Sequence, residues 1–198
     1  MSLQRSYTLL APLYDTVVGR ASRRARAESL RWLQSLPAGD VFLGGVGTGL
    51  DLPYLPPRHR YAALDLTRAM LVRALPRTRD LDVAWVQGNS EALPFRDSTF
   101  DCAVLHLIVA VVAHPDRALM EAARVVRRGG TLLVLDKFLA QGSAAPLRRL
   151  VSPLLARIAT RTDVELESLL EKTPELRVIG DAPALAGGWF RRLVLEKQ

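Results

Sequence analysis

The sequence predicts an α/β fold, with one seven-stranded, mainly parallel sheet, helices on both of its faces and an antiparallel hairpin at one edge. Three observations lead to this prediction. Short apolar runs alternate with amphipathic segments along most of the chain, which is typical of strands joined by helices. The runs are apolar at consecutive positions, as expected for strands covered on both faces. The last two runs are separated only by a short Pro- and Gly-containing stretch, which favours a hairpin.

The expected strands follow from the apolar runs between turn signals. They cover residues 41–44, 60–65, 82–87, 98–107, 131–138, 176–181 and 189–197. The expected helices follow from helical spacing, caps and breakers. They cover residues 20–36, 67–73, 115–127, 147–158 with a kink at Pro153, and 163–172.

Composition predicts a single domain over residues 1–198, in which residues 1–36 form an N-terminal helical segment. The hydrophobic fraction of 49% is sufficient for one buried core. The N-terminus does not have the pattern of a signal peptide, and no apolar run reaches the length of a membrane span. A single cysteine, Cys102, in an apolar run fits a buried thiol and a cytoplasmic protein.

Basic residues outnumber acidic ones, with 27 Lys and Arg against 20 Asp and Glu. A basic surface is compatible with nucleic acid, anionic lipid, acidic small molecules or simple solubility, so charge alone does not decide between them. With three histidines and one cysteine, we expect no metal site.

The most informative stretch is VFLGGVGTGLDLPYL, residues 41–55, in which Gly45, Gly47 and Gly49 follow an apolar run. Glycines in such a turn let backbone N–H groups approach a ligand closely. Asp65, at the end of the second expected strand, has a carboxylate that can accept both hydroxyl hydrogens of a ribose. A glycine turn without a ligand is the alternative interpretation.

The loop spacing resembles the nucleoside loop of class I S-adenosylmethionine-dependent methyltransferases. The stretch QGNSEALPFRDSTFD resembles two further motifs of that superfamily, and ALMEAARVVRRGGTLLVLD resembles the subgroup typified by ubiquinone and menaquinone biosynthesis. The resemblance implies a Rossmann-like fold, S-adenosyl-L-methionine as cofactor, and adenine recognition by Asn89. The cofactor-binding residues that it implies are Tyr7, Tyr14, Gly45, Val46, Gly47, Thr48, Gly49, Asp65, Leu66, Met70, Asn89, Ser90 and His106.

The stretches YTLLAPLYDTVVGR, GVGTGLDLPYLP and GGWFRRLVLEK are similar to small bacterial phosphatidylethanolamine N-methyltransferases. In that group the N-terminal segment is a lid over the cofactor, and Tyr7 and Tyr14 are the matching tyrosines. The alternative for these two residues is packing in a docking helix. His106 and Tyr14 are the candidate catalytic residues. His106 has two open roles, a general base and a hydrogen-bonded histidine that lines the cofactor pocket.

One position departs from the family pattern. An acidic residue that helps to hold the methionine ammonium is expected two residues before the first loop glycine, where this chain has Leu43. Either backbone carbonyls and water hold the ammonium, or the site has decayed. The loss of one charge-assisted hydrogen bond costs about 1.5–3 kcal/mol, which weakens binding without abolishing it.

The stretch HLIVAVVAHP, residues 106–115, is apolar where base-methylating enzymes carry a polar motif, so we expect no nucleic-acid acceptor. An apolar wall suits a lipid, a quinone or another hydrophobic small molecule. The leading prediction is methyl transfer to a lipid-like acceptor such as phosphatidylethanolamine nitrogen. Peripheral contact of Arg148, Arg149 and Arg157 with the inner membrane is one interpretation of their helix, and a helix packed on its own sheet with these arginines in solvent is the other. The alternatives are a quinone or soluble-metabolite methyltransferase, and a non-catalytic cofactor-binding relative.

Overall fold

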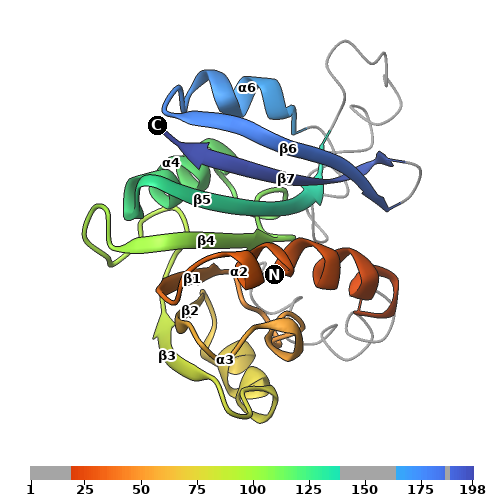
Figure 1. Cartoon of the computed structure of the whole chain (residues 1–198), viewed down its shortest axis with the longest axis vertical. Coiled ribbons are helices and arrows are strands. Elements are labelled where there is room, and N and C mark those ends of the chain that lie inside the picture. Colours follow the sequence, from red (N-terminus) through yellow and green to blue (C-terminus); the bar gives the residue numbers. More distant parts are fainter. Residues whose placement is uncertain (1–18, 139–163, 186–187) are drawn as a thin grey trace.

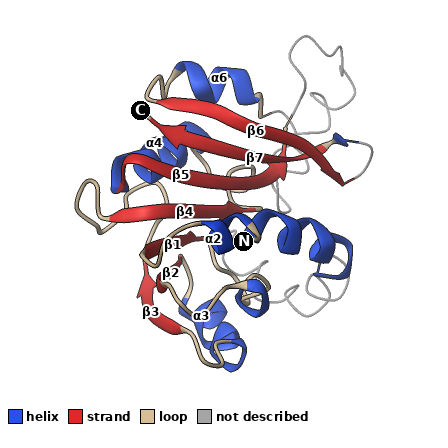
Figure 2. Cartoon of the chain, in the orientation of Figure 1, coloured by secondary structure: helices blue, strands red, loops and turns tan. Residues whose placement is uncertain are grey.

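The computed structural model describes residues 19–138, 164–185 and 188–198, and these form one twisted seven-stranded sheet (Figures 1 and 2). The strand order is β3-β2-β1-β4-β5-β7-β6. The strands are β1 (Asp40–Gly44), β2 (Arg60–Asp65), β3 (Asp82–Gln87), β4 (Phe100–His106), β5 (Val126–Lys137), β6 (Leu176–Leu185) and β7 (Phe190–Lys197).

The sheet is parallel from β3 to β5 and antiparallel at one edge, as predicted. Strand β1 pairs in parallel with both β2 and β4, and β4 pairs in parallel with β5. Strand β7 is antiparallel to both β5 and β6, which confirms the edge hairpin. After β1 the chain continues to β2 on one side of the sheet, and after β4 it continues to β5 on the other side. The crevice between the carboxyl ends of β1 and β4 is the point at which such folds bind ligands.

The helices lie near the predicted ranges, with different ends. They are a first helix over residues 19–30, α2 (Trp32–Ser35), α3 (Arg68–Ala74), α4 (Pro115–Val125) and α6 (Leu166–Glu171), with the short helices η1 (Leu52–Tyr54) and η2 (Leu75–Arg77). The expected helix over residues 20–36 is interrupted by a turn at Arg31. The expected helix over residues 115–127 ends at Val125, because the backbone already joins β5 at Val126. The expected helix over residues 147–158 lies outside the described residues.

Two apolar cores lie on opposite faces of the sheet. Phe42 of β1 packs in one core, which also holds residues of α4 and α6. Its neighbours Val41 and Leu43 point the other way and pack with the first helix, α2 and α3. Alternation along β1 thus confirms a sheet with helices on both faces.

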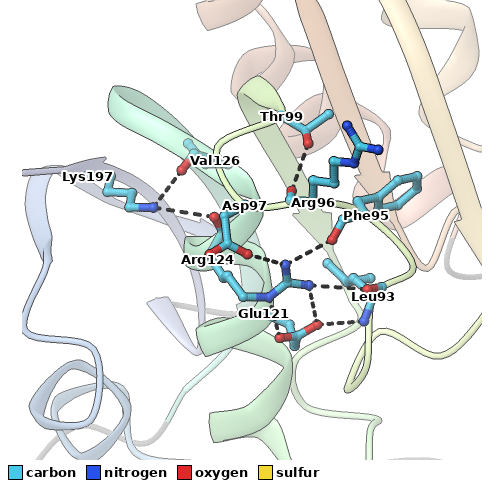
Figure 3. Close-up of polar contacts among 9 residues, drawn as sticks. All are labelled: Leu93, Phe95, Arg96, Asp97, Thr99, Glu121, Arg124, Val126 and Lys197. Atoms are coloured by element: carbon cyan, nitrogen blue, oxygen red, sulfur yellow. Dashed lines mark hydrogen bonds and ion pairs between the residues drawn. The ribbon is translucent and has the colours of Figure 1, made fainter.

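The loop after β3 is fixed to α4 by Arg124 (Figure 3). The Arg124 guanidinium donates hydrogen bonds to Glu121 and Asp97, and to the carbonyl oxygens of Leu93 and Phe95. Glu121 in turn accepts a hydrogen bond from the Leu93 N–H at 2.6 Å. This clamp sets the path of the segment that carries Asn89 and Ser90 toward the carboxyl end of the sheet.

The C-terminal end of the first helical segment is held by two consecutive basic residues. Arg58 donates to the carbonyl oxygens of Leu33, Gln34 and Leu36. His59, which is buried, bonds to the Leu33 carbonyl through Nε2 and accepts the Gly39 N–H at Nδ1. The positive charge of Arg58 at the C-terminal end of α2 is favourable, and the two residues together anchor α2 to the sheet.

Candidate cofactor site

The glycine loop has the backbone that the sequence pattern predicts. Gly45, Gly47 and Gly49 all have positive φ angles, of 63°, 56° and 81°. An added Cβ at Gly49 would meet the side chain of Leu52 at 2.8 Å, whereas one at Gly47 would meet only the Gly45 carbonyl oxygen at 3.9 Å. Gly49 therefore serves packing, and Gly47 faces open space in which a ligand can approach the backbone.

Asp65 ties this loop to the end of β2. Its Oδ2 accepts the N–H of Gly47 at 2.9 Å, and its Oδ1 accepts the N–H of Thr67 at 2.9 Å. A carboxylate has lone pairs beyond those used here, and Asp65 is only half-buried, so it can accept further hydrogen bonds. The structure brings Asp65 to the loop, as its predicted role requires.

The other predicted residues of the nucleoside side lie close by. The N–H of Gly88 donates to the carbonyl oxygen of Asp65, which brings the end of β3 beside the end of β2. Asn89 is exposed, and its Oδ1 accepts the N–H of Glu91 at 2.9 Å. Leu66 is 50% exposed, which is high for a leucine beside a glycine loop. The remaining predicted residues Val46, Thr48, Met70 and Ser90 are buried.

A buried polar cluster lies beneath the loop, on the β1–β4 side. The Nη1 of Arg26 donates to Asp51 Oδ2 at 2.7 Å, and His106 Nδ1 lies 2.8 Å from Asp51 Oδ1. The Nε2 of His106 lies 3.0 Å from Ser29 Oγ, and the Nε of Arg26 donates to Ser22 Oγ. Figure 1 shows the first helix, which carries Ser22, Arg26 and Ser29, passing the carboxyl end of β4.

The Asp51 carboxylate is the centre of this cluster. Burial alone would raise the pKa of Asp51, but Arg26 and His106 outweigh burial and hold it well below its usual value. Asp51 is therefore ionised and paired in a nearly closed environment.

The two open roles of His106 can be compared with its surroundings. Its side chain is fully buried and both ring nitrogens have partners, so in this arrangement it supports Asp51 and lines the crevice. A role as general base would require His106 to give up one of these partners, and that role stays a prediction.

Leu43 lies in the apolar core on the side of the first helix and is 3% exposed. Strand β1 therefore presents no charged side chain to the loop from this position. Tyr7 and Tyr14, predicted for the lid, lie outside the described residues.

A second buried carboxylate positions the segment after β4. Asp136, at the end of β5, accepts the N–H of Ala110 at 3.0 Å and the N–H of Lys137 at 2.8 Å. Burial raises the pKa of Asp136 to about 6. Asp136 thus fixes the turn that continues the apolar wall from His106.

The sequence interpretation missed Arg26, Asp51 and Asp136. For Arg26 a signal was available, because Ser22, Arg26 and Ser29 recur at helical spacing along one side of the first helix. With Ala25 and Leu30 they form its buried face.

Comparison with known proteins is consistent with this geometry. Residues 43–134 match the methyltransferase domain family. Over its full length the chain is 29% identical to a phosphatidylethanolamine N-methyltransferase of Cereibacter sphaeroides, covering 100% of this chain and 98% of that protein. Over 77 residues it is 44% identical to the ubiquinone/menaquinone biosynthesis C-methyltransferase UbiE of Roseobacter denitrificans, covering 37% of this chain and 31% of that protein.

Among solved structures, the fold resembles an S-adenosylmethionine-dependent methyltransferase of Thermotoga maritima. The TM-score is 0.72 over 100% of both chains, at 20% identity. The matched domain contains the glycine loop, Asp65, Asn89 and His106, and the strand order places them at the carboxyl end of the sheet. The chain thus contains a methyltransferase domain, and its fold is that of class I S-adenosylmethionine-dependent methyltransferases.

Proposed function

We propose that the enzyme methylates a lipid-like acceptor, and that the acceptor atom is the amine nitrogen of phosphatidylethanolamine. The observation that carries this proposal is the end-to-end match to a phosphatidylethanolamine N-methyltransferase. The matches to ubiquinone/menaquinone biosynthesis methyltransferases cover 37% to 68% of this chain and 31% to 58% of those proteins, so they support the common cofactor chemistry more than a common acceptor.

The surface after β4 supports a hydrophobic acceptor. Residues 107–112 are all apolar, and Val109 and Ala110 are buried against the core. Leu107, Ile108, Val111 and Val112 are half-buried, so they can line a binding surface. This wall continues directly from His106 at the end of β4, beside the crevice that takes the cofactor.

Methyl transfer requires mainly that the acceptor nitrogen is aligned with the methyl group of the cofactor. The cofactor supplies an electrophilic methyl group on a sulfonium centre. The nitrogen lone pair forms the new C–N bond as the C–S bond breaks, and the proton of the methylated ammonium leaves to water. The loop and Asp65 would hold the nucleoside, and the apolar wall would exclude water from the reacting atoms. The segment before residue 19, with Tyr7 and Tyr14, is proposed as the lid, and Tyr14 and His106 as candidates that orient the acceptor nitrogen.

Contact with a bilayer would be peripheral. No helix within the described ranges is long and apolar enough to cross a membrane. The outward face of the first helix carries Arg20, Arg23 and Arg24, and Arg31 follows at the turn that ends it; all four are exposed. Such a basic face suits the anionic surface of the inner leaflet.

A transfer assay tests the proposal. The purified chain is incubated with radiolabelled S-adenosylmethionine and vesicles of phosphatidylethanolamine, vesicles of phosphatidylcholine, or a demethylated quinol in detergent, and the products are separated by chromatography. We expect label in mono- and dimethylated phosphatidylethanolamine only, and loss of that label in Asp65→Ala. Label in the quinol alone would favour the quinone alternative. Cofactor binding without transfer to any of these acceptors would contradict the phospholipid proposal.

A further inference from the structure

The Arg26–Asp51 ion pair has a position that stability alone does not explain. The side chains are 6% and 10% exposed, so both charges have been taken almost completely out of water. A buried ion pair is often no more stabilising than apolar side chains of similar size, because desolvation offsets the attraction. The residues around it already form an apolar core that includes Leu30, Leu43 and Leu52.

The pair lies where a ligand is expected. Asp51 follows the glycine loop by two residues, and its partner His106 ends β4, so their hydrogen bond spans the crevice between β1 and β4. This is the switch point of the strand order. The first helix covers the crevice and brings Arg26 and Ser29 to it.

The pair also has the right chemistry for a zwitterion. The amino-acid end of the cofactor carries an ammonium and a carboxylate on one carbon. Each oxygen of Asp51 accepts one described hydrogen bond and can accept another, and the guanidinium of Arg26 has N–H donors beyond those given to Ser22 and Asp51. A carboxylate and a guanidinium side by side complement these two charges, whereas the apolar Leu43 of β1 can pair with neither.

We propose that the buried Arg26–Asp51 pair, held by His106 and Ser29, is the subsite for the amino-acid end of the cofactor, with Asp51 binding the ammonium and Arg26 binding the carboxylate. In this arrangement Asp51 takes the role of the acidic residue that the family pattern has at the position of Leu43. The inference concerns the cofactor and is independent of the acceptor.

Two ligands that differ only at this end test the subsite. S-adenosylhomocysteine has the amino-acid group, and 5′-methylthioadenosine keeps the adenine, ribose and sulfur without it. Calorimetry should show that Asp51→Asn and Arg26→Gln each weaken S-adenosylhomocysteine by at least about tenfold, the loss of one charge-assisted contact, while 5′-methylthioadenosine changes by less than about twofold. Melting temperatures without ligand establish that each variant is folded.

Analogues assign the two charges separately. Asp51→Asn should bind S-adenosylhomocysteine and its deaminated analogue equally, and Arg26→Gln should bind S-adenosylhomocysteine and its decarboxylated analogue equally. Arg58→Lys is the control, because Arg58 anchors α2, which follows the first helix, away from the crevice and should not change the ratio of the two ligands' affinities.

Two results would overturn the proposal. If neither substitution changes either ligand, the pair does not touch the cofactor. If both ligands weaken equally, the pair is a structural support for the loop. Should one variant fail to fold, Asp51→Glu and Arg26→Lys replace it, and an unchanged ratio of ligand affinities in these variants counts against the subsite in the same way.

Discussion

At the scale of single residues, two carboxylates near one loop have different surroundings. Asp65 is half-buried and accepts mainly backbone N–H groups, whereas Asp51 is buried and paired with Arg26. The Asp65 carboxylate can therefore accept hydrogen bonds from neutral hydroxyl groups, whereas the Asp51 carboxylate stays ionised in a closed site. Their substitutions should therefore affect different parts of the cofactor.

Asp65→Ala should weaken S-adenosylhomocysteine and 5′-methylthioadenosine alike, by at least about tenfold, because both carry the ribose and both lose a charged acceptor. Calorimetry of the two ligands gives the comparison. Asp82→Ala removes an exposed carboxylate at the start of β3, at the opposite edge of the sheet, and should leave both affinities within about twofold. Normal binding to Asp65→Ala would exclude the ribose role.

Asp136 should make stability depend on pH. Its folded pKa of about 6 lies above the ordinary value of 3.8, because burial disfavours the charged form. The protonated form therefore contributes stability that is complete below pH 3.8 and is lost as the pH rises through 6. Asp136→Asn cannot ionise, so its stability relative to the natural chain should rise by roughly 2 kcal/mol between pH 4 and pH 7.

Urea denaturation of both proteins across this pH range measures the difference. The constant offset from the altered hydrogen bonds to Ala110 and Lys137 does not matter, because only the change with pH is tested. Parallel stability curves would show that Asp136 does not titrate in this window.

The sequence identified the residues of the loop because their signal is local. Gly45, Gly47 and Gly49 are adjacent in the chain, and Asp65 ends an easily recognised strand. Arg26, Asp51 and His106 were not connected, because they are 25 and 55 residues apart and meet only when the first helix folds over β4. From the sequence alone, an arginine in a helix is expected at the surface, because its buried partner is not yet known.

At the scale of elements, strands were predicted better than helix ends. Strands β2 and β3 have the predicted bounds, since each is a short β-favouring run between turn residues. The helix expected over residues 115–127 ends two residues early, because the chain pairs with the sheet from Val126 onward. Tertiary pairing thus decides the end of α4, and a local signal does not.

Arg124 should be one of the more important contacts between elements. Arg124→Ala removes hydrogen bonds to two carboxylates and two carbonyl groups, so the free energy of unfolding should fall by about 1.5–3 kcal/mol. Arg117→Ala, at an exposed position of the same helix, should change it by no more than about 0.5 kcal/mol. Chemical denaturation compares the two, and equal effects would mean that the clamp in Figure 3 adds little to stability.

At the scale of the whole molecule, the strand order brings the glycine loop, Asp65, the segment at Asn89, and His106 to the same edge of the sheet. The first helix covers this edge at β4 and carries exposed arginines outward. A bilayer in contact with this face would therefore lie close to the site as well. The net charge of +7 makes the attraction to an anionic surface favourable over the whole molecule.

Binding to vesicles should therefore depend on where the charge lies and on salt. Each arginine near an anionic surface contributes about 1 kcal/mol, which falls off within a Debye length of about 8 Å at physiological salt. In flotation with anionic vesicles, the triple variant Arg20→Glu, Arg23→Glu, Arg31→Glu should lose most binding at low salt. The control variant Arg96→Glu, Arg117→Glu, Arg128→Glu has the same change in net charge, placed on the loop after β3, on α4 and on β5. It should keep most of the vesicle binding. Equal losses would show that total charge alone drives association, and no flotation of the natural chain at any salt would favour a soluble acceptor.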